Sequence, residues 1–302
     1  MNVIGKHNDI AVVDALPIAK PFLTTYIIID EEIAIIDCGP KISIPQILES
    51  LKKLKVEPSK IAYILLTHIH IDHAGGAGEL IKHLPNARVV IHRKGIPHMI
   101  NPETLWRKTK ETLGNLADFY GEISPIPKER IIEAREGEKI ELGNNKIIIW
   151  ETPGHASHSV TYEIPDRAII FPGDLAGIYI EPWNISFPTT PKPFNAEKTF
   201  TSIEKLIKRK PKTICFPHYG VNSARTNYLA RYREKLKLWI ETVNNNIAQK
   251  EEDILRIIMA KDKELARSIK KILRHKIWRE SIMRTIKGIK SYITWKNENQ
   301  QK

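Results

Sequence analysis

One short segment of the chain concentrates side chains that bind metal ions. An apolar stretch, IAYILL at residues 61–66, runs directly into Thr67-His68-Ile69-His70-Ile71-Asp72-His73-Ala74-Gly75-Gly76. The stretch is typical of a buried strand, and on its extended end His68 and His70 would point the same way. The turn that follows can bring Asp72 and His73 to a second position nearby. Three histidines and an aspartate at this spacing favour a metal site over a polar loop with histidines by chance.

The ligand types narrow the choice of metal. Imidazole together with carboxylate is the donor set expected for zinc, iron or manganese, and not for calcium. We therefore expect divalent metal ions here, with zinc first and iron or manganese as alternatives. Thr67, Asp37 and Ser157 are candidate hydrogen-bond acceptors that would fix the histidine tautomers.

Three further apolar strands end in a tight turn that carries one ligand-type residue. They are followed by Thr152-Pro153-Gly154-His155, by Phe171-Pro172-Gly173-Asp174 and by Phe216-Pro217-His218-Tyr219-Gly220. Strand ends that converge on one rim of a rigid scaffold are a common way to present a site. We expect His155, Asp174 and His218 to join the first cluster there.

The first 221 residues alternate short strands with amphipathic helices, which predicts two packed sheets covered by helices. Residues 95–120 are expected to form one or two inserted helices, which we predict to act as a lid over the site. The expected strands are Ile10–Val13, Thr24–Ile29, Ile33–Asp37, Ile61–Thr67, Val89–His92, Lys139–Leu142, Lys146–Glu151, Val160–Ile164, Ala168–Phe171 and Thr213–Phe216. The expected helices outside the insert are Ile44–Leu54, Gly76–Leu84 and Ala196–Lys208.

From residue 222 onward the sequence is almost wholly helical and strongly basic. Residues 223–302 hold 20 Lys and Arg against nine Asp and Glu, whereas the preceding residues are nearly balanced. We therefore divide the chain into a catalytic domain, 1–221, and a basic helical region, 222–302. The charge indicates either an acidic partner such as nucleic acid or the solvated surface of a heat-adapted, Lys-rich protein. The amphipathic helices could cover their own domain or pair with a second copy in a homodimer.

Other global features point to the cytoplasm. No run of 18 apolar residues occurs, so no membrane span or membrane partner is expected. The N-terminus lacks the pattern of a secretory signal. Cys38 and Cys215 lie far apart in apolar runs, which favours buried free thiols in a reducing compartment.

The ligand pattern resembles the metallo-β-lactamase superfamily. The resemblance rests on the H-x-H-x-D-H cluster at 68–73, the later His155, Asp174 and His218, and the Asp-Cys-Gly turn at 37–39, and it covers about residues 10–220. It implies an α/β (α+β) fold, the four-layer αββα sandwich, here with a helical C-terminal extension. It also implies two metal ions. One would be held by His68, His70 and His155, the other by Asp72, His73 and His218, and Asp174 would bridge them.

The resemblance points to the glyoxalase II-like branch of the superfamily. Flavodiiron proteins usually carry Glu at the place of His70, the commonest β-lactamases carry Cys at the place of Asp174, and the spacing between ligands leaves no room for the large cap of RNA-processing nucleases. The expected activity is hydrolysis of thioester, lactone or related ester small molecules by a metal-bridging hydroxide. Asp72 would also orient the nucleophile, and the candidate substrate-binding residues are Tyr179, Tyr219, Trp106 and Trp183.

Two other functions remain as alternatives. A metal-dependent ribonuclease or phosphodiesterase would use the same metals and bind nucleic acid through the basic C-terminal helices. A metal-binding scaffold without catalysis is the third interpretation, and the intact ligand set disfavours it.

Overall fold

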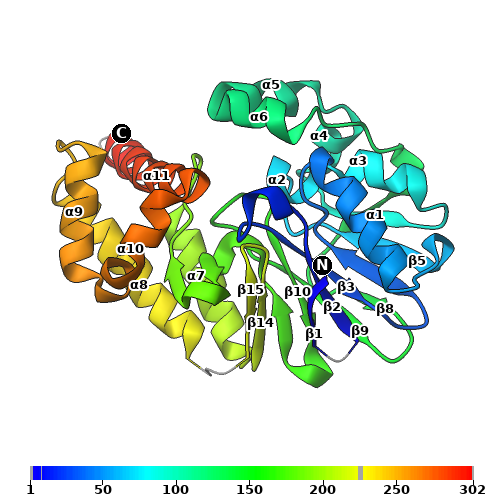
Figure 1. The fold of residues 1–302 in the computed structure, drawn as a ribbon. Coiled ribbons are helices and arrows are strands. Elements are labelled where there is room, and N and C mark those ends of the chain that lie inside the picture. The colour runs from blue at the N-terminus through cyan, green and yellow to red at the C-terminus, as the bar shows by residue number, and fades with distance from the viewer. Residues whose placement is uncertain (1–2, 8, 224–226, 301–302) are drawn as a thin grey trace.

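The computed structural model describes residues 3–7, 9–223 and 227–300, and its centre is a pair of sheets packed face to face (Figure 1). The first sheet has seven strands in the order β1 to β7, antiparallel up to β4 and parallel from β4 onward. Its strands are β1 (Val3–His7), β2 (Ile10–Asp14), β3 (Thr24–Ile28), β4 (Ile33–Ile36), β5 (Ile61–Leu65), β6 (Arg88–His92) and β7 (Ile131–Ala134).

The second sheet has six strands in the order β15-β14-β11-β10-β9-β8. Only β11 and β14 are parallel neighbours. Its strands are β8 (Lys139–Glu141), β9 (Lys146–Glu151), β10 (Val160–Ile164), β11 (Ile169–Phe171), β14 (Thr213–Phe216) and β15 (Gly220–Asn222). A separate hairpin consists of β12 (Ile178–Ile180) and β13 (Ile185–Phe187).

Alternation along the strands builds a layered core. Leu65 of β5 and Tyr162 of β10 belong to the apolar cluster between the two sheets, whereas Ile64 faces the cluster shared with the helices. Because both faces of β5 are covered, the strand is apolar along its length. Figure 1 shows α1 (Ile44–Lys53) and α3 (Ala77–Leu80) outside the first sheet and α7 (Ala196–Lys208) beside the second. The predicted αββα fold is confirmed.

The inserted segment forms three helices, not one or two. They are α4 (Ile96–Ile100), α5 (Glu103–Leu113) and α6 (Asn115–Tyr120). Gly114 separates the last two with a φ of 55°, a conformation that glycine adopts without steric cost. In Figure 1 these helices lie above the short helix α2 (Ile71–Ala74), which contains two of the ligand candidates.

The C-terminal helices share one continuous apolar core with the sandwich. They are α8 (Tyr228–Asn244), α9 (Glu251–Lys261), α10 (Lys263–Arg274) and α11 (Lys276–Gln300). Trp239 and Trp278 are completely buried in the cluster that also contains residues of α7 and of both sheets. Among the helices of the described residues, none is long and apolar enough to cross a membrane.

Candidate metal centre

All seven ligand candidates lie at the ends of four strands or just beyond them. β5 leads to His68 and His70, and α2 begins immediately afterwards, so that Asp72 and His73 occupy its single turn. β9, β11 and β14 end shortly before His155, Asp174 and His218. The structure brings these residues together in three overlapping groups, which are His68-His70-His155, His68-His73-Asp174 and Asp72-His73-His218.

Glycines shape two of the turns that carry ligand candidates. Gly154 and Gly173 directly precede His155 and Asp174, and both have positive φ, 149° and 54°. A Cβ atom on Gly173 would lie 2.7 Å from Oγ1 of Thr67, and one on Gly154 would lie 2.5 Å from Cα of Thr199. The turns therefore require glycine both for their backbone conformation and for close packing.

Three imidazole nitrogens face one another in the first group. Nδ1 of His70 lies 3.1 Å from Nε2 of His68 and 3.1 Å from Nε2 of His155. A tetrahedral zinc ion with bonds of about 2.0–2.1 Å would hold such nitrogens roughly 3.3 Å apart. Burial lowers the pKa of all three rings, and for His68 and His70 the neighbouring imidazoles lower it further. These rings are therefore neutral, as metal ligands must be.

Asp72, His73 and His218 lie around the carboxylate of Asp174, and we call these three residues the second group. Nε2 of His73 and Nε2 of His218 each lie 3.5 Å from Oδ1 of Asp174. Asp72 closes the group, with carboxylate oxygens 3.9 Å from His73 Nε2 and 3.8 Å from His218 Nε2. The other oxygen of Asp174, Oδ2, lies 3.5 Å from His155 Nε2. One carboxylate thus faces both groups.

Two buried atoms at the centre of this arrangement lack a hydrogen-bond partner in the described part of the chain. They are Nε2 of His73 and Oδ1 of Asp174. A buried polar atom without a partner is costly, and such atoms often mark an ion site. Their position between the two groups, together with the nitrogen and oxygen donors around them, fits a divalent cation.

The pKa shifts in the second group show that it favours positive charge. Burial lowers the pKa of His73, but the carboxylates of Asp174, Asp72 and Asp37 outweigh burial and raise it to about 10. For His218 too, Asp174 overcomes the effect of burial and the pKa is raised. Burial alone would raise the pKa of Asp174, but the surrounding histidines bring it well below its ordinary range. Asp174 is therefore ionised.

Two of the three expected acceptors lie behind the ligand candidates. Nδ1 of His73 is 2.9 Å from Oδ2 of Asp37. The same carboxylate accepts hydrogen bonds from the backbone N–H and the hydroxyl of Thr67, both at 2.8 Å, and the Thr67 hydroxyl oxygen lies 3.1 Å from Nδ1 of His68. The third, Ser157, accepts a hydrogen bond from Nζ of Lys94 at 3.5 Å through its backbone carbonyl.

Backbone carbonyls orient two other histidines, and these two acceptors were not predicted. Nδ1 of His155 donates to the carbonyl of Thr189, and Nδ1 of His218 donates to the carbonyl of Phe22, both at 3.0 Å. Because each of these rings uses Nδ1 for its hydrogen bond, Nε2 of each ring points towards Asp174. A carbonyl acceptor has no sequence signature, because every residue has one.

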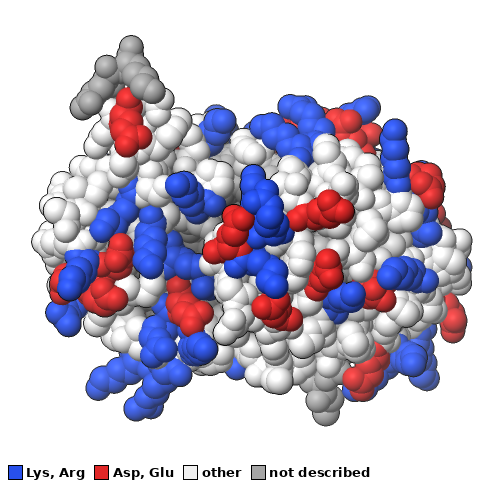
Figure 2. Space-filling model, turned by 90° about the horizontal axis from the view of Figure 1, so that it is seen from above, with Lys and Arg blue, Asp and Glu red and all other residues white. Residues whose placement is uncertain are grey.

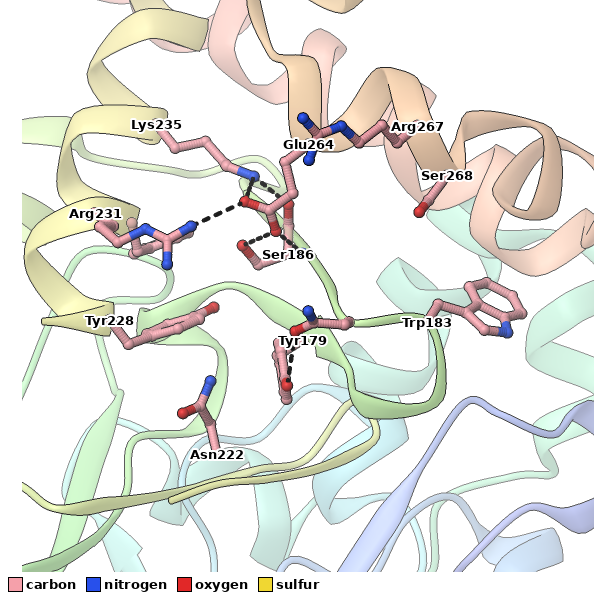
Figure 3. A pocket seen from close by; sticks show the side chains of 12 residues that line it. Tyr179, Trp183, Ser186, Asn222, Tyr228, Arg231, Lys235, Glu264, Arg267 and Ser268 are labelled. Carbon is pink, nitrogen blue, oxygen red and sulfur yellow. Dashed lines mark hydrogen bonds and ion pairs between the residues drawn. The ribbon is translucent and has the colours of Figure 1, made fainter. Parts of the chain in front are cut away.

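The four candidate substrate residues do not join the histidine cluster. The Tyr219 hydroxyl donates to buried Asp14 at 3.0 Å, and Trp106 is half-buried beneath Lys110. Tyr179 and Trp183 line a pocket of 440 Å³ with Arg231, Lys235 and Glu264 (Figure 3). No ligand candidate is among the described residues that line this pocket. A role for these four residues in substrate binding stays a prediction.

Two aromatic residues that were not predicted as site residues lie next to His218, and a third, Tyr120, is influenced by the charge of Asp72. The Phe22 and Trp278 rings lie 5.2 and 5.7 Å from the imidazole of His218, measured between centroids. Burial raises the pKa of the Tyr120 hydroxyl well above its ordinary value, and the nearby Asp72 carboxylate raises it further. These contacts depend on how the insert and α11 dock, which no local motif reveals.

Comparisons with known proteins agree with this geometry. A family model described as the metallo-beta-lactamase superfamily matches residues 22–218. A metallo-beta-lactamase fold-containing protein of Sulfurisphaera tokodaii is 32% identical over 171 residues, which cover 55% of this chain and 63% of that protein. A hydroxyacylglutathione hydrolase of Cereibacter sphaeroides is 27% identical over 61% of this chain and 59% of that enzyme. The chain thus spans less than two thirds of these curated relatives.

Solved structures extend the similarity over more of the chain. The crystal structure of an archaeal metallo-beta-lactamase superfamily protein from Sulfolobus tokodaii superposes with a TM-score of 0.66 at 26% identity, covering 76% of this chain and 87% of that one. A family protein from Thermus thermophilus gives a TM-score of 0.62 at 18% identity, covering 78% and 82%, and shows the shared fold alone. Since the family model spans all seven ligand candidates, the chain belongs to the metallo-beta-lactamase superfamily.

Proposed function

We propose that this chain is a dinuclear metal-dependent hydrolase of thioesters, lactones or related small esters. The observation that carries the proposal is the position of Asp174, whose two oxygens each lie 3.5 Å from histidines of a different group. A carboxylate placed in this way suits a bridge between two metal ions. Members of this superfamily are generally hydrolases.

Each ligand candidate would have a defined role at the two metal ions. His68, His70 and His155 would hold one ion, Asp72, His73 and His218 the other, and Asp174 both. When bound, two divalent ions make a water acidic enough to supply hydroxide at neutral pH and polarise the carbonyl of the substrate. Asp37 and Thr67 keep the His73 ring in the orientation that turns Nε2 towards Asp174.

Asp72 is the acidic ligand candidate that reaches solvent. Its side chain is 24% exposed, compared with 5% for Asp174. Its carboxylate can therefore accept a hydrogen bond from the attacking water, orient it towards the substrate carbonyl, and pass a proton to the leaving group. Phe22 and Trp278 pack around His218 and keep bulk water from that side of the site.

Two observations support esters and thioesters as the substrate class. Three similar proteins bear the name hydroxyacylglutathione hydrolase, two from strains of Cereibacter sphaeroides and one from Buchnera aphidicola. Asp174 would occupy the bridging position, where the commonest β-lactamases carry a cysteine, as the family resemblance implies. A glyoxalase II-like thioesterase is therefore the first activity to test.

The nuclease alternative is not favoured. Many basic side chains of the C-terminal helices pair with acids, such as Lys290 with Glu251 at 3.3 Å and Lys235 with Glu264 at 3.0 Å. Figure 2 shows Asp and Glu interspersed among Lys and Arg on the upper face of the molecule. Interspersed charges of both signs make a weaker phosphate-binding surface than a continuous basic stripe.

A substrate panel on zinc-loaded protein tests the proposal. The panel contains a glutathione thioester, a lactone, a p-nitrophenyl ester and an RNA oligonucleotide. We expect hydrolysis of at least one ester or thioester, and a loss of roughly 100-fold or more in Asp72→Asn. Cleavage of RNA with no activity on the other three substrates would overturn the proposal.

A further inference from the structure

The inserted helices and the C-terminal helices together enclose a cleft that the site described above does not use. Its volume is 730 Å³, and it is lined by residues of α5, α9, α10 and α11. Sites for small organic ligands typically occupy about 300–1,000 Å³. Figure 1 shows the insert above α2, which contains Asp72 and His73.

The floor of the cleft is apolar and incompletely covered by protein. It consists of Leu113, Leu255, Met259, Leu273 and Met283. Four of these, all but Leu255, are only partly buried against the core. Helix α5 carries an apolar side with Leu105, Trp106 and Leu113, yet none of its residues is fully buried. Two of the five are methionines, whose flexible side chains adapt to varied aliphatic shapes.

The cleft is linked to the candidate metal centre through the start of α11. Arg279 and Glu280 line the cleft, and Glu280 forms an ion pair with Arg284 at 3.6 Å. Arg279 and Glu280 directly follow Trp278, whose ring packs against the imidazole of His218 with centroids 5.7 Å apart. The first turn of α11 therefore borders both the cleft and the candidate metal centre.

The lining of the cleft contains four basic side chains and two acidic ones, Glu252 and Glu280. Arg256 pairs with Asp253 at 2.9 Å, and Arg284 pairs with Glu280. The remaining two cations, Arg279 and Lys287, form no ion pair with any carboxylate in the described ranges. An apolar floor beneath unpaired cations is complementary to a molecule with an aliphatic chain and a negative charge.

We propose that this cleft binds the aliphatic acyl chain of an anionic ester or thioester substrate. The inference rests on the proposed function and names its substrate class. In the reaction, water adds to the acyl carbonyl and the bond to the leaving sulfur or oxygen breaks. The products are a fatty carboxylate, a thiol or alcohol, and a proton. The chain lies along α5 and α11, and Arg279 and Lys287 attract the negative charge of the substrate.

Calorimetric titration of the metal-loaded full chain with butanoate, octanoate and dodecanoate tests the cleft without catalysis. Butanoate reports binding of a carboxylate at the metals alone. We expect the dissociation constant to fall by about fourfold for each methylene that the cleft fully buries. Leu113→Gln and Met283→Gln should weaken dodecanoate binding by roughly tenfold. Leu105→Gln, on the same helix but outside the cleft lining, should bind like the wild type.

Charge is tested in a second pair of variants. Lys287→Gln should weaken dodecanoate binding, whereas Lys270→Gln, an exposed lysine outside the cleft lining, should not. Equal affinity for butanoate and dodecanoate, or equal losses in Leu113→Gln and Leu105→Gln, would overturn the inference.

The hydrolysis of acyl thioesters of increasing chain length separates this inference from the proposed function. If esters are hydrolysed but kcat/KM does not depend on chain length, the cleft is not an acyl site, while the proposed hydrolase function stands. If fatty-acid binding depends on chain length but no ester is hydrolysed, the cleft is a ligand site, while the proposed hydrolase function is wrong.

Discussion

The indole of Trp278 packs against the imidazole of His218, with ring centroids 5.7 Å apart. Trp278 belongs to the last helix, is completely buried, and donates its indole N–H to the carbonyl of Pro21 at 2.8 Å. Phe22, whose carbonyl holds the His218 ring, lies against both aromatic residues. The C-terminal helices therefore contact the candidate metal centre directly.

Trp278→Ala should destabilise the fold and loosen the second metal position. Truncation of a buried tryptophan costs about 3–5 kcal/mol of unfolding free energy, and the cavity would free the His218 ring to turn. Urea unfolding and metal content measure the two effects. Trp295→Ala provides the control, because Trp295 is on the same helix but 53% exposed. Equal effects of the two variants would contradict the role given to Trp278.

Asp37→Asn should weaken metal binding without unfolding the protein. Asp37 has a φ of 50°, a conformation that asparagine also adopts readily. The amide, however, cannot accept from both Thr67 and His73 through two oxygens. Loss of such an outer partner typically lowers metal affinity by roughly 10–100-fold. Chelator competition measures it, with Asp166→Asn, on an exposed turn, as the control. Unchanged affinity would show that Asp37 does not orient His73.

Gly288→Ala should separate α11 from the sandwich. A Cβ atom at this position would lie 1.5 Å from the carbonyl oxygen of Thr190, and that oxygen belongs to backbone that cannot move easily. Overpacking of this kind costs about 1–3 kcal/mol or more. Denaturant unfolding compares it with Gly5→Ala, where nothing lies within 4 Å of the added atom. We expect Gly5→Ala to be nearly neutral, and a neutral Gly288→Ala would argue against the close docking of α11.

Replacement of residues 103–113 by a Gly-Ser linker of equal length should change substrate range and leave the metals in place. Helix α5 contains no buried residue, so its removal exposes little core. It does supply Leu113 to the cleft. Metal analysis and a chain-length series of thioesters measure the outcome. Loss of metal in this variant would mean that the insert supports the centre and is not a lid.

The sequence allowed the convergence of the seven ligand candidates to be predicted, because each follows an apolar strand and is surrounded by turn residues. The strands that it predicted lie within one or two residues of those observed, since most of them are apolar runs bounded by turn residues. Five strands were not predicted: β12, β13 and β15, which have three residues each, and β1 and β7, the two partly exposed edge strands of the first sheet. Such strands are defined by their pairing partners, and a short run has little periodicity to detect.

The sequence did not predict how the helices pack against the rest of the protein. An amphipathic helix shows that one face is covered, but it does not say by what. The contacts of Trp278 with His218 and of Gly288 with Thr190 join residues about 60 and 100 positions apart, and neither has a local signature. Tyr219 shows that the side chain of a sequence neighbour of a ligand candidate can point elsewhere. It directly follows His218, yet its hydroxyl donates to Asp14.

The metal content of the reconstituted protein tests the central claim most directly. After reconstitution with zinc and removal of excess metal, we expect about two ions per chain in the wild type and about one in His218→Ala, which removes one of the two groups. His158→Ala is the control, since His158 packs near His68 and His70 but is absent from the three candidate groups, and it should keep both ions. A wild-type chain that holds one ion or none, or a His218→Ala chain that still holds two, would contradict the dinuclear centre.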